Sequence, residues 1–356
     1  MKVHGPVNYV YLKRKSDNKH IIIFYDVHDT ENNQKCTESS IDIVEFIKKH
    51  LAPHFTSKNK LDIFVEQPLF YKENEEYTEP SSLDKMRRLL NKCPENMRCH
   101  HADVRKYIGF DIYFNLKNLY TDMIEHFRIN RMTDLFNVKL FNSFIPNYIN
   151  LLESCLQQIS YMYLTDKTFH KDLLQSSLFS KQYKKISKDD QYKYLAINKK
   201  LKQEIKNYFN LHDKFIGELN ECLEKSKNTI RHIDKCIQQN NIDIYKMLDD
   251  FYIYEIIPEI KDLNMSLELL ISIISKTSDI YTIGRLLKPY VKTAVVYMGA
   301  EHGRNISKFL VDTFDFEIIN SYKDQGYPSW KTFEKIYGNT KDIYCIDISM
   351  DKLQFY

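Results

Sequence analysis

The sequence of 356 residues lacks any long hydrophobic run, and this absence argues against a membrane-spanning segment. Its longest apolar stretches, such as the one from Leu269 to Ile274, fall far short of the roughly 20 residues that a bilayer-spanning helix needs. Residues 1–6 also contain no apolar core of the length found in signal peptides. We therefore expect a cytoplasmic protein without membrane association.

Arginine is also scarce, since only 10 of the 51 basic residues are arginine and the rest are lysine. Nucleic-acid-binding domains usually have a pI above about 9 and clustered basic residues, whereas this chain has a pI of about 8.2 and a net charge of +3. Bidentate phosphate recognition favours arginine. The composition therefore argues against a nucleic-acid partner. The abundance of Lys, Asn, Ile and Tyr, which have AT-rich codons, indicates an AT-rich genome.

The sequence contains no CxxC pair and an odd number of cysteines, seven. This pattern argues against a zinc ribbon and against a dense disulfide framework. We expect reduced thiols, with a single bond between Cys93 and Cys99 as the alternative. The GxGxxG, Walker, GxSxG and HExxH signatures are missing as well, so none of these motifs indicates a function.

Two parts of the chain, 1–125 and 279–356, alternate between strand-like and helix-like patterns. Short runs rich in Ile, Val, Phe and Tyr, bounded by turn residues, are typical of strands buried on both faces. Strands that alternate with helices favour a mostly parallel sheet. The expected strands are 7–12, 20–27, 61–65, 97–101, 293–298, 316–319 and 343–348, and the expected helices are 39–51 and 305–314.

The middle of the chain, 126–278, has a different pattern and contains a single glycine. From Leu201 to Ile237, apolar residues recur at intervals that place them on one face of a helix. We expect a break near Asn228 and a kink or break at Pro258. The apolar stripes are interpreted as the packing core of a helical subdomain.

These patterns predict an α/β fold with a mostly parallel or mixed central sheet, flanked by helices and interrupted by a large all-helical insertion. Residues 1–125 are expected to form the first part of the α/β domain, 126–278 the helical insertion and 279–356 the second part. The two α/β parts should share one sheet, because each part alone has few strands with which to bury a hydrophobic face.

Titratable side chains follow four of the expected strands. These residues are His28, Glu66, Asp103 and His302, and Arg105 lies close to the third of them. Because ligands bind at the carboxyl ends of strands in open parallel sheets, we expect these side chains to converge in one cleft. Two imidazoles and two carboxylates suit either a divalent metal ion or general acid–base catalysis.

Each of these residues also has a structural alternative. His28 fits a polar loop, Glu66 fits a helix cap, and Asp103 fits an ion pair with Arg105. The most indicative histidine lies in the glycine-bounded segment 299–303, which we expect to form a tight loop. Glycine there would let the chain approach a ligand closely.

Taken in order, these motifs resemble the superfamily that includes TIKI proteases, TraB/PrgY proteins, erythromycin esterases and ChaN-like haem-binding proteins. The second GxxH motif of that superfamily is matched by residues 299–302, whereas the first is matched by 25–28 with Tyr25 in place of glycine. Glu66 matches the glutamate after the next strand, and residues 103–105 resemble the Asp-Arg element with one residue inserted. Divergent members occur in large DNA viruses, which agrees with the AT-rich composition.

The resemblance implies a mixed sheet with an active cleft, and a choice of chemistries. Its members include metal-dependent peptidases, metal-free esterases and haem-binding proteins, so the fold alone does not select one. We expect a hydrolase of peptide or ester bonds, assisted by one divalent metal ion (Zn, Mn or Co). His28, Glu66 and His302 would be the ligands and catalytic groups, and Asp103 and Arg105 would orient them.

The competing hypothesis is a catalytically inactive member of this fold that serves as a viral or host-interaction protein. Its helical insertion would then bind a protein partner, and its location would be the host cytoplasm or the virion. An enzyme would instead bind a peptide or small-molecule substrate. Neither hypothesis includes nucleic acid or a membrane.

Overall fold

A computed structural model describes the chain over residues 1–27, 39–68, 81–105, 113–118, 120–121, 147, 150, 185–239, 257–322 and 345–353. The chain divides into two compact units. The first unit contains residues 1–104, 174–198 and 276–356, and the second contains 105–173 and 199–275. No helix in the described part of the chain is both long enough and apolar enough to cross a membrane.

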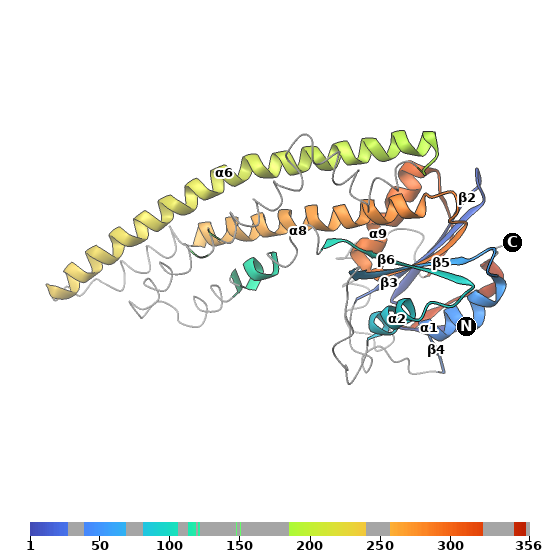
Figure 1. Cartoon of the computed structure of the whole chain (residues 1–356). Helices are drawn as coiled ribbons and strands as arrows, with labels where there is room; N and C mark the ends of the chain where they lie inside the picture. The colour runs from blue at the N-terminus through green and yellow to red at the C-terminus, as the bar shows by residue number, and fades with distance from the viewer. Residues whose placement is uncertain are drawn as a thin grey trace. The chain divides into compact units, whose positions relative to one another are not determined.

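The first unit is built on a six-stranded mixed sheet with the strand order β6-β5-β7-β3-β2-β8. Figure 1 labels four of these strands, β6, β5, β3 and β2. The strands β6, β5, β7 and β3 run parallel to one another. At the β3 edge, β2 pairs antiparallel with β3, and β8 pairs antiparallel with β2. The predicted α/β class with a mixed sheet is thereby confirmed. The bounds are β2 Asn8–Arg14, β3 Lys19–Asp26, β5 Leu61–Pro68, β6 Met97–Asp103, β7 Thr293–Gly299 and β8 Glu317–Ser321.

The two ends of the chain contribute to this one sheet, as expected. β7 comes from the C-terminal part and lies between β5 and β3 of the N-terminal part, with Val295 in register with Ile63 on one side and Ile22 on the other. All three side chains are fully buried. Within the described portion of residues 126–278, every regular element is a helix.

The structure contains a second, three-stranded sheet, of which only the strand β9 was predicted. It has the order β4-β1-β9, with β1 Lys2–His4, β4 Ile41–Asp42 and β9 Cys345–Asp347. The expected helix 39–51 is real only from Ile43, where α1 (Ile43–Phe46) begins and continues as a π-helix, Ile47–Leu51. Asp42 caps α1 by accepting the Val44 N–H at 2.8 Å. Strands of two or three residues are too short to show a periodic pattern.

Helices cover both faces of the six-stranded sheet. One face packs against α1 and α2 (Ser82–Asn91), and together they form an apolar core. The other face packs against α9 (Ala300–Phe314) and the last turns of α8 (Ile257–Leu286). Members of the apolar core include Tyr11, Ile22, Phe24, Phe46, Leu51, Ile63, Val65, Met86, Leu89, Val295 and Tyr297.

The predicted break near Asn228 is wrong. The helix α6 runs without interruption over Lys188–Gln238, and the Asn228 side chain accepts a hydrogen bond from Arg231 at 3.1 Å instead of ending the helix. Pro258 is the second residue of α8. Proline suits the first turn of a helix, where it removes no intrahelical hydrogen bond. Residues 240–256 lie outside the described residues, so the kink or break expected at Pro258 stays a prediction.

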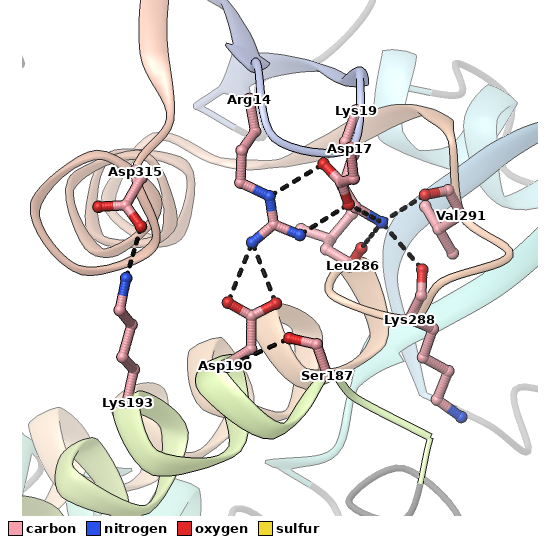
Figure 2. A network of polar contacts seen from close by, with 10 residues as sticks. All are labelled: Arg14, Asp17, Lys19, Ser187, Asp190, Lys193, Leu286, Lys288, Val291 and Asp315. Atoms are coloured by element: carbon pink, nitrogen blue, oxygen red, sulfur yellow. Dashed lines mark hydrogen bonds and ion pairs between the residues drawn. The ribbon is translucent and has the colours of Figure 1, made fainter.

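A polar network joins the start of α6 and the end of α8 to the hairpin between β2 and β3 (Figure 2). Arg14 Nη1 donates to both carboxylate oxygens of Asp190 at 3.1 Å, and its Nε and Nη2 donate to Asp17 at 3.0 and 2.8 Å. Nearby, Lys193 Nζ lies 2.5 Å from Asp315 Oδ2. These contacts hold the first turns of α6 within the first unit.

Lys19 lies at the centre of the same network and is fully buried. Its ammonium group donates to the carbonyl oxygens of Leu286 at 3.0 Å and Lys288 at 2.9 Å, and also to that of Val291 (Figure 2). A cation at the C-terminal end of a helix satisfies carbonyls that have no intrahelical partner. Burial is the main cause that lowers the pKa of Lys19, to about 8.

The expectation of reduced thiols throughout is wrong, because Cys93 and Cys99 form a disulfide bond. The bond joins the turn after α2 to β6, and the two Cα atoms lie 5.9 Å apart, within the usual range for a disulfide. Cys345 in β9 is disulfide-bonded as well. The alternative prediction is therefore correct for the Cys93–Cys99 pair, but this pair is not the single bond that was expected.

Candidate functional site

Two of the expected site residues meet at the carboxyl ends of β5 and β7. Glu66 lies near the end of β5, and His302 lies in the first turn of α9, directly after β7. His302 Nε2 is 3.8 Å from Glu66 Oε1. The other Glu66 oxygen, Oε2, accepts the Gly299 N–H at 2.6 Å, which fixes the carboxylate against the end of β7. Adjacent parallel strands thus bring the two side chains together.

The other ring nitrogen of His302 is held by a carboxylate that was not predicted to be part of the site. His302 Nδ1 lies 2.5 Å from Oδ1 of Asp279, which is almost completely buried in α8. Asn305 donates from Nδ2 to the second oxygen of Asp279 at 3.2 Å. An ionised carboxylate only accepts hydrogen bonds, so this pairing assigns a proton to Nδ1, and Nε2 faces Glu66.

This arrangement has the components of a general acid–base site. The carboxylate of Asp279 orients the imidazole and would stabilise its charged form after proton uptake. At 3.8 Å, the Nε2–Oε1 separation exceeds a hydrogen bond, but it is short enough for one water molecule to lie about 2.8 Å from both atoms. The side chain of His302 keeps 12% of its surface exposed, so solvent reaches the site.

The segment that contains His302 is a helix and not the tight loop that was expected. α9 begins at Ala300, directly after Gly299, which has φ −50° and ψ 143°. These angles are open to any residue, so Gly299 does not use the conformational freedom of glycine. An alanine and an acidic residue in the first turn favour a helix here, because Glu301 complements the positive end of the helix dipole.

Tyr25 has a packing role that explains how the protein accommodates it at the glycine position of the first motif. Its ring lies against α9 at Gly303, where an added Cβ would be only 2.5 Å from the ring. Its hydroxyl group lies 2.9 Å from Ser307 Oγ, one turn further along α9. A large residue on β3 and glycine on α9 therefore fit together and fix the helix that carries His302.

The remaining predicted residues are placed as follows. His28 lies outside the described residues. Asp103 is the buried last residue of β6, in register with Pro68, so it lies at the same edge of the sheet as Glu66. Arg105 belongs to the second compact unit. Their expected roles in ligation and orientation stay predictions.

The residues that sequence reasoning missed are Asp279 and Asn305. The available signal was a carboxylate next to the apolar Ile280 and Tyr281 near the end of α8, because an unpaired buried charge is costly. Its partner could not be inferred, since helix periodicity does not tell which other helix lies opposite. The same limit applies to the buried His100 of β6. Its ring contacts Asp62 of β5 on one side and Arg285 of α8 on the other.

A metal ion would find only part of a ligand set here. Within the described ranges, no group of three or more His, Cys, Asp or Glu side chains is placed to hold one. His302 Nε2 and Glu66 Oε1 supply two donors, which is fewer than the three protein ligands of typical catalytic zinc sites.

The sheet and its polar edge define an α/β protein with a His-Asp pair and a neighbouring glutamate. A comparison with protein-family models matches residues 70–328, more than half of the chain, so the protein belongs to the "Family of unknown function (DUF5847)". No solved structure matches the chain.

Two similar proteins come from Acanthamoeba polyphaga mimivirus. "Uncharacterized protein R161" is 28% identical over 291 residues, covering 68% of this chain and 64% of that protein. "Uncharacterized protein R706" is 24% identical over 279 residues, covering 70% of this chain and 63% of that protein. The chain thus spans just under two thirds of these relatives. Similarity to viral proteins is confirmed, whereas membership of the TIKI/TraB superfamily stays a prediction.

Proposed function

We propose that this protein is a hydrolase of peptide or ester bonds that uses His302 as its general base. The observation that carries the proposal is the geometry of His302, with Nδ1 2.5 Å from Asp279 and Nε2 3.8 Å from Glu66. A histidine whose one nitrogen is fixed by a buried carboxylate is oriented for proton transfer at the other nitrogen.

In the proposed reaction, a water molecule lies between His302 and Glu66. His302 Nε2 takes a proton from this water while its oxygen attacks the substrate carbonyl carbon. Asp279 stabilises the imidazolium ion, which then gives the proton to the leaving amine or alcohol as the C–N or C–O bond breaks. Glu66, held by the Gly299 N–H, orients the water. The products are a carboxylic acid and the protonated leaving group.

Metal assistance is a separate part of the proposal. His302 and Glu66 would be two ligands of a Zn, Mn or Co ion, and His28 is the expected third. A divalent ion would polarise the substrate carbonyl. The test is the metal content of purified protein, where about one equivalent that disappears in His302→Ala supports it, and no metal in wild type contradicts it.

The activity itself is tested with a panel of peptide and ester substrates. Wild type is compared with His302→Gln and Asp279→Asn, and His54→Gln is the control because His54 is exposed in the first unit. General acid–base catalysis contributes about 10²- to 10⁴-fold, so both site variants should lose at least about 10²-fold while the control keeps full activity.

Equal rates in wild type and both site variants would contradict the assignment of His302. Absence of hydrolysis by wild type across the panel, with and without added metal, would instead favour the alternative of a catalytically inactive fold that binds a viral or host protein.

A further inference from the structure

The last turns of α8 are fastened to β6 by a line of polar contacts. Ser278 and Thr282 both donate to the Ala102 carbonyl at 3.2 Å, and Ser278 Oγ also accepts the Val104 N–H at 3.3 Å. At the next turn, Arg285 Nη2 lies 2.7 Å from His100 Nδ1. Ser278, Thr282 and Arg285 are spaced four and three residues apart, so they share one face of the helix. We call these contacts the α8–β6 seam.

The partners of His100 determine which of its nitrogens carries a proton. A guanidinium group only donates, so His100 Nδ1 must accept from Arg285 with its lone pair. The proton then lies on Nε2, which is 2.7 Å from Oδ1 of the fully buried Asp62. The neutral imidazole therefore satisfies both partners at once, whereas an imidazolium ion would point an N–H at the Arg285 guanidinium.

We propose that His100 is a pH-sensitive latch: its neutral ring fastens the end of α8 to β6, and protonation releases Arg285. The released segment carries Asp279, less than two turns before Arg285. Acidification would thus displace the carboxylate that orients His302, and this consequence rests on the proposed function. The latch itself does not depend on it.

The charges that face His100 come from three elements. Asp62 on β5 favours the protonated ring, while Arg98 on β6 and Arg285 on α8 disfavour it. Arg98 also satisfies Asp62, with Nε and Nη2 donating at 2.8 and 2.6 Å. The ring stacks on Phe64 at 4.4 Å between centroids, with little solvent contact. Burial is the largest effect and lowers the pKa of His100.

The sign of the pH effect follows from this lowered pKa. In the unfolded chain a histidine takes up a proton near pH 6.5, while the folded protein resists it at His100. Below that pH, unfolded or locally opened states bind one more proton than the closed state, so closure weakens as pH falls. With one extra proton bound in the open state, the equilibrium constant for opening increases by up to about tenfold for each pH unit of acidification.

The test is amide hydrogen exchange of residues 276–286 between pH 7.5 and 5, expressed as protection factors. Wild type should lose up to about tenfold in protection per pH unit below 6.5. His100→Gln should show no such loss, because its amide can donate to Asp62 and accept from Arg285 without titrating. His54→Gln is the matched control and should behave as wild type. Equal pH dependence in wild type and His100→Gln would overturn the latch.

A second measurement does not depend on how any variant folds. The ¹⁵N signals of the imidazole in wild type at neutral pH should show His100 with its proton on Nε2. A proton on Nδ1 would overturn the proposal. The downfield Nδ1–H proton of His302 should disappear on acidification in wild type and persist in His100→Gln, and equal behaviour in both would overturn the link to Asp279. These readouts need no substrate, so they remain decisive even if hydrolysis is never observed.

Discussion

The strand β5 shows how different the two faces of the sheet are. Ile63 and Val65 point to the face covered by α1 and α2, where they join the hydrophobic core. Asp62 and Glu66, which flank them at the alternate positions of the strand, point to the face covered by α8 and α9, where they contact His100 and His302. Alternation along one strand thus separates a face that stabilises the fold from a face that holds paired, titratable groups.

The polar face is costly to build, and the structure shows how the cost is offset. A buried charge without a partner is strongly destabilising. Asp62 is satisfied by Arg98 and His100, and Asp279 by His302 and Asn305. The paired, titratable groups of this face are the ones that the proposed hydrolysis requires.

The largest effect is expected from a truncation on the apolar face. Ile22→Ala removes a fully buried side chain from the core and should lower the free energy of unfolding by about 2–5 kcal/mol, through lost burial and a cavity. Chemical denaturation measures it. The matched control is Ile319→Ala in β8, whose side chain is 45% exposed and whose loss should cost far less. Equal losses of stability at the two positions would contradict the claim that the core on this face stabilises the fold.

A smaller loss is expected from overpacking the polar face. Gly303→Ala places a Cβ 2.5 Å from the Tyr25 ring, and such crowding typically costs about 1–3 kcal/mol. Gly217→Ala is the control, because nothing lies within 4 Å of its added Cβ and alanine is about 1 kcal/mol better than glycine inside a helix. Thermal denaturation should therefore show opposite signs. Stabilisation by Gly303→Ala would mean that α9 is not fixed by Tyr25.

The buried Lys19 predicts a change in stability with alkaline pH. Its pKa is about 8 in the folded protein and about 10.4 in an unfolded chain. Between these values the unfolded chain binds the extra proton, so Lys19 makes the free energy of unfolding rise with pH. Lys19→Met should lack this contribution. Denaturation of both proteins at pH 8, 9 and 10 measures it, and parallel curves would contradict the burial of a charged Lys19.

The smallest effect on stability is expected at the candidate site. His302→Gln keeps an N–H that can reach Asp279, and the side chain is already partly exposed, at 12%. It should change the free energy of unfolding by about 1 kcal/mol or less. A loss of stability as large as that of Ile22→Ala would show that His302 is a core residue, and would contradict its proposed catalytic role.

The apolar face could be predicted from the sequence to a greater extent than the polar one. Runs such as residues 20–27 carry their own evidence, because buried parallel strands are continuously apolar. Glu66 and His302 could be proposed from their positions after strands. Asp279 could not, since its partner depends on how α8 packs against α9. The predicted helix break at Asn228 was wrong because the effect of asparagine on a helix depends on its side-chain contacts, here with Arg231.

The most direct test measures hydrolysis and stability together in wild type, His302→Gln and Ile22→Ala. The substrate is the peptide or ester that wild type cleaves fastest, and rates are expressed per folded molecule. The account predicts that His302→Gln loses at least about 10²-fold in rate with its stability almost unchanged, while Ile22→Ala loses stability and keeps its rate. The opposite pattern, an active His302→Gln that is strongly destabilised, would contradict it.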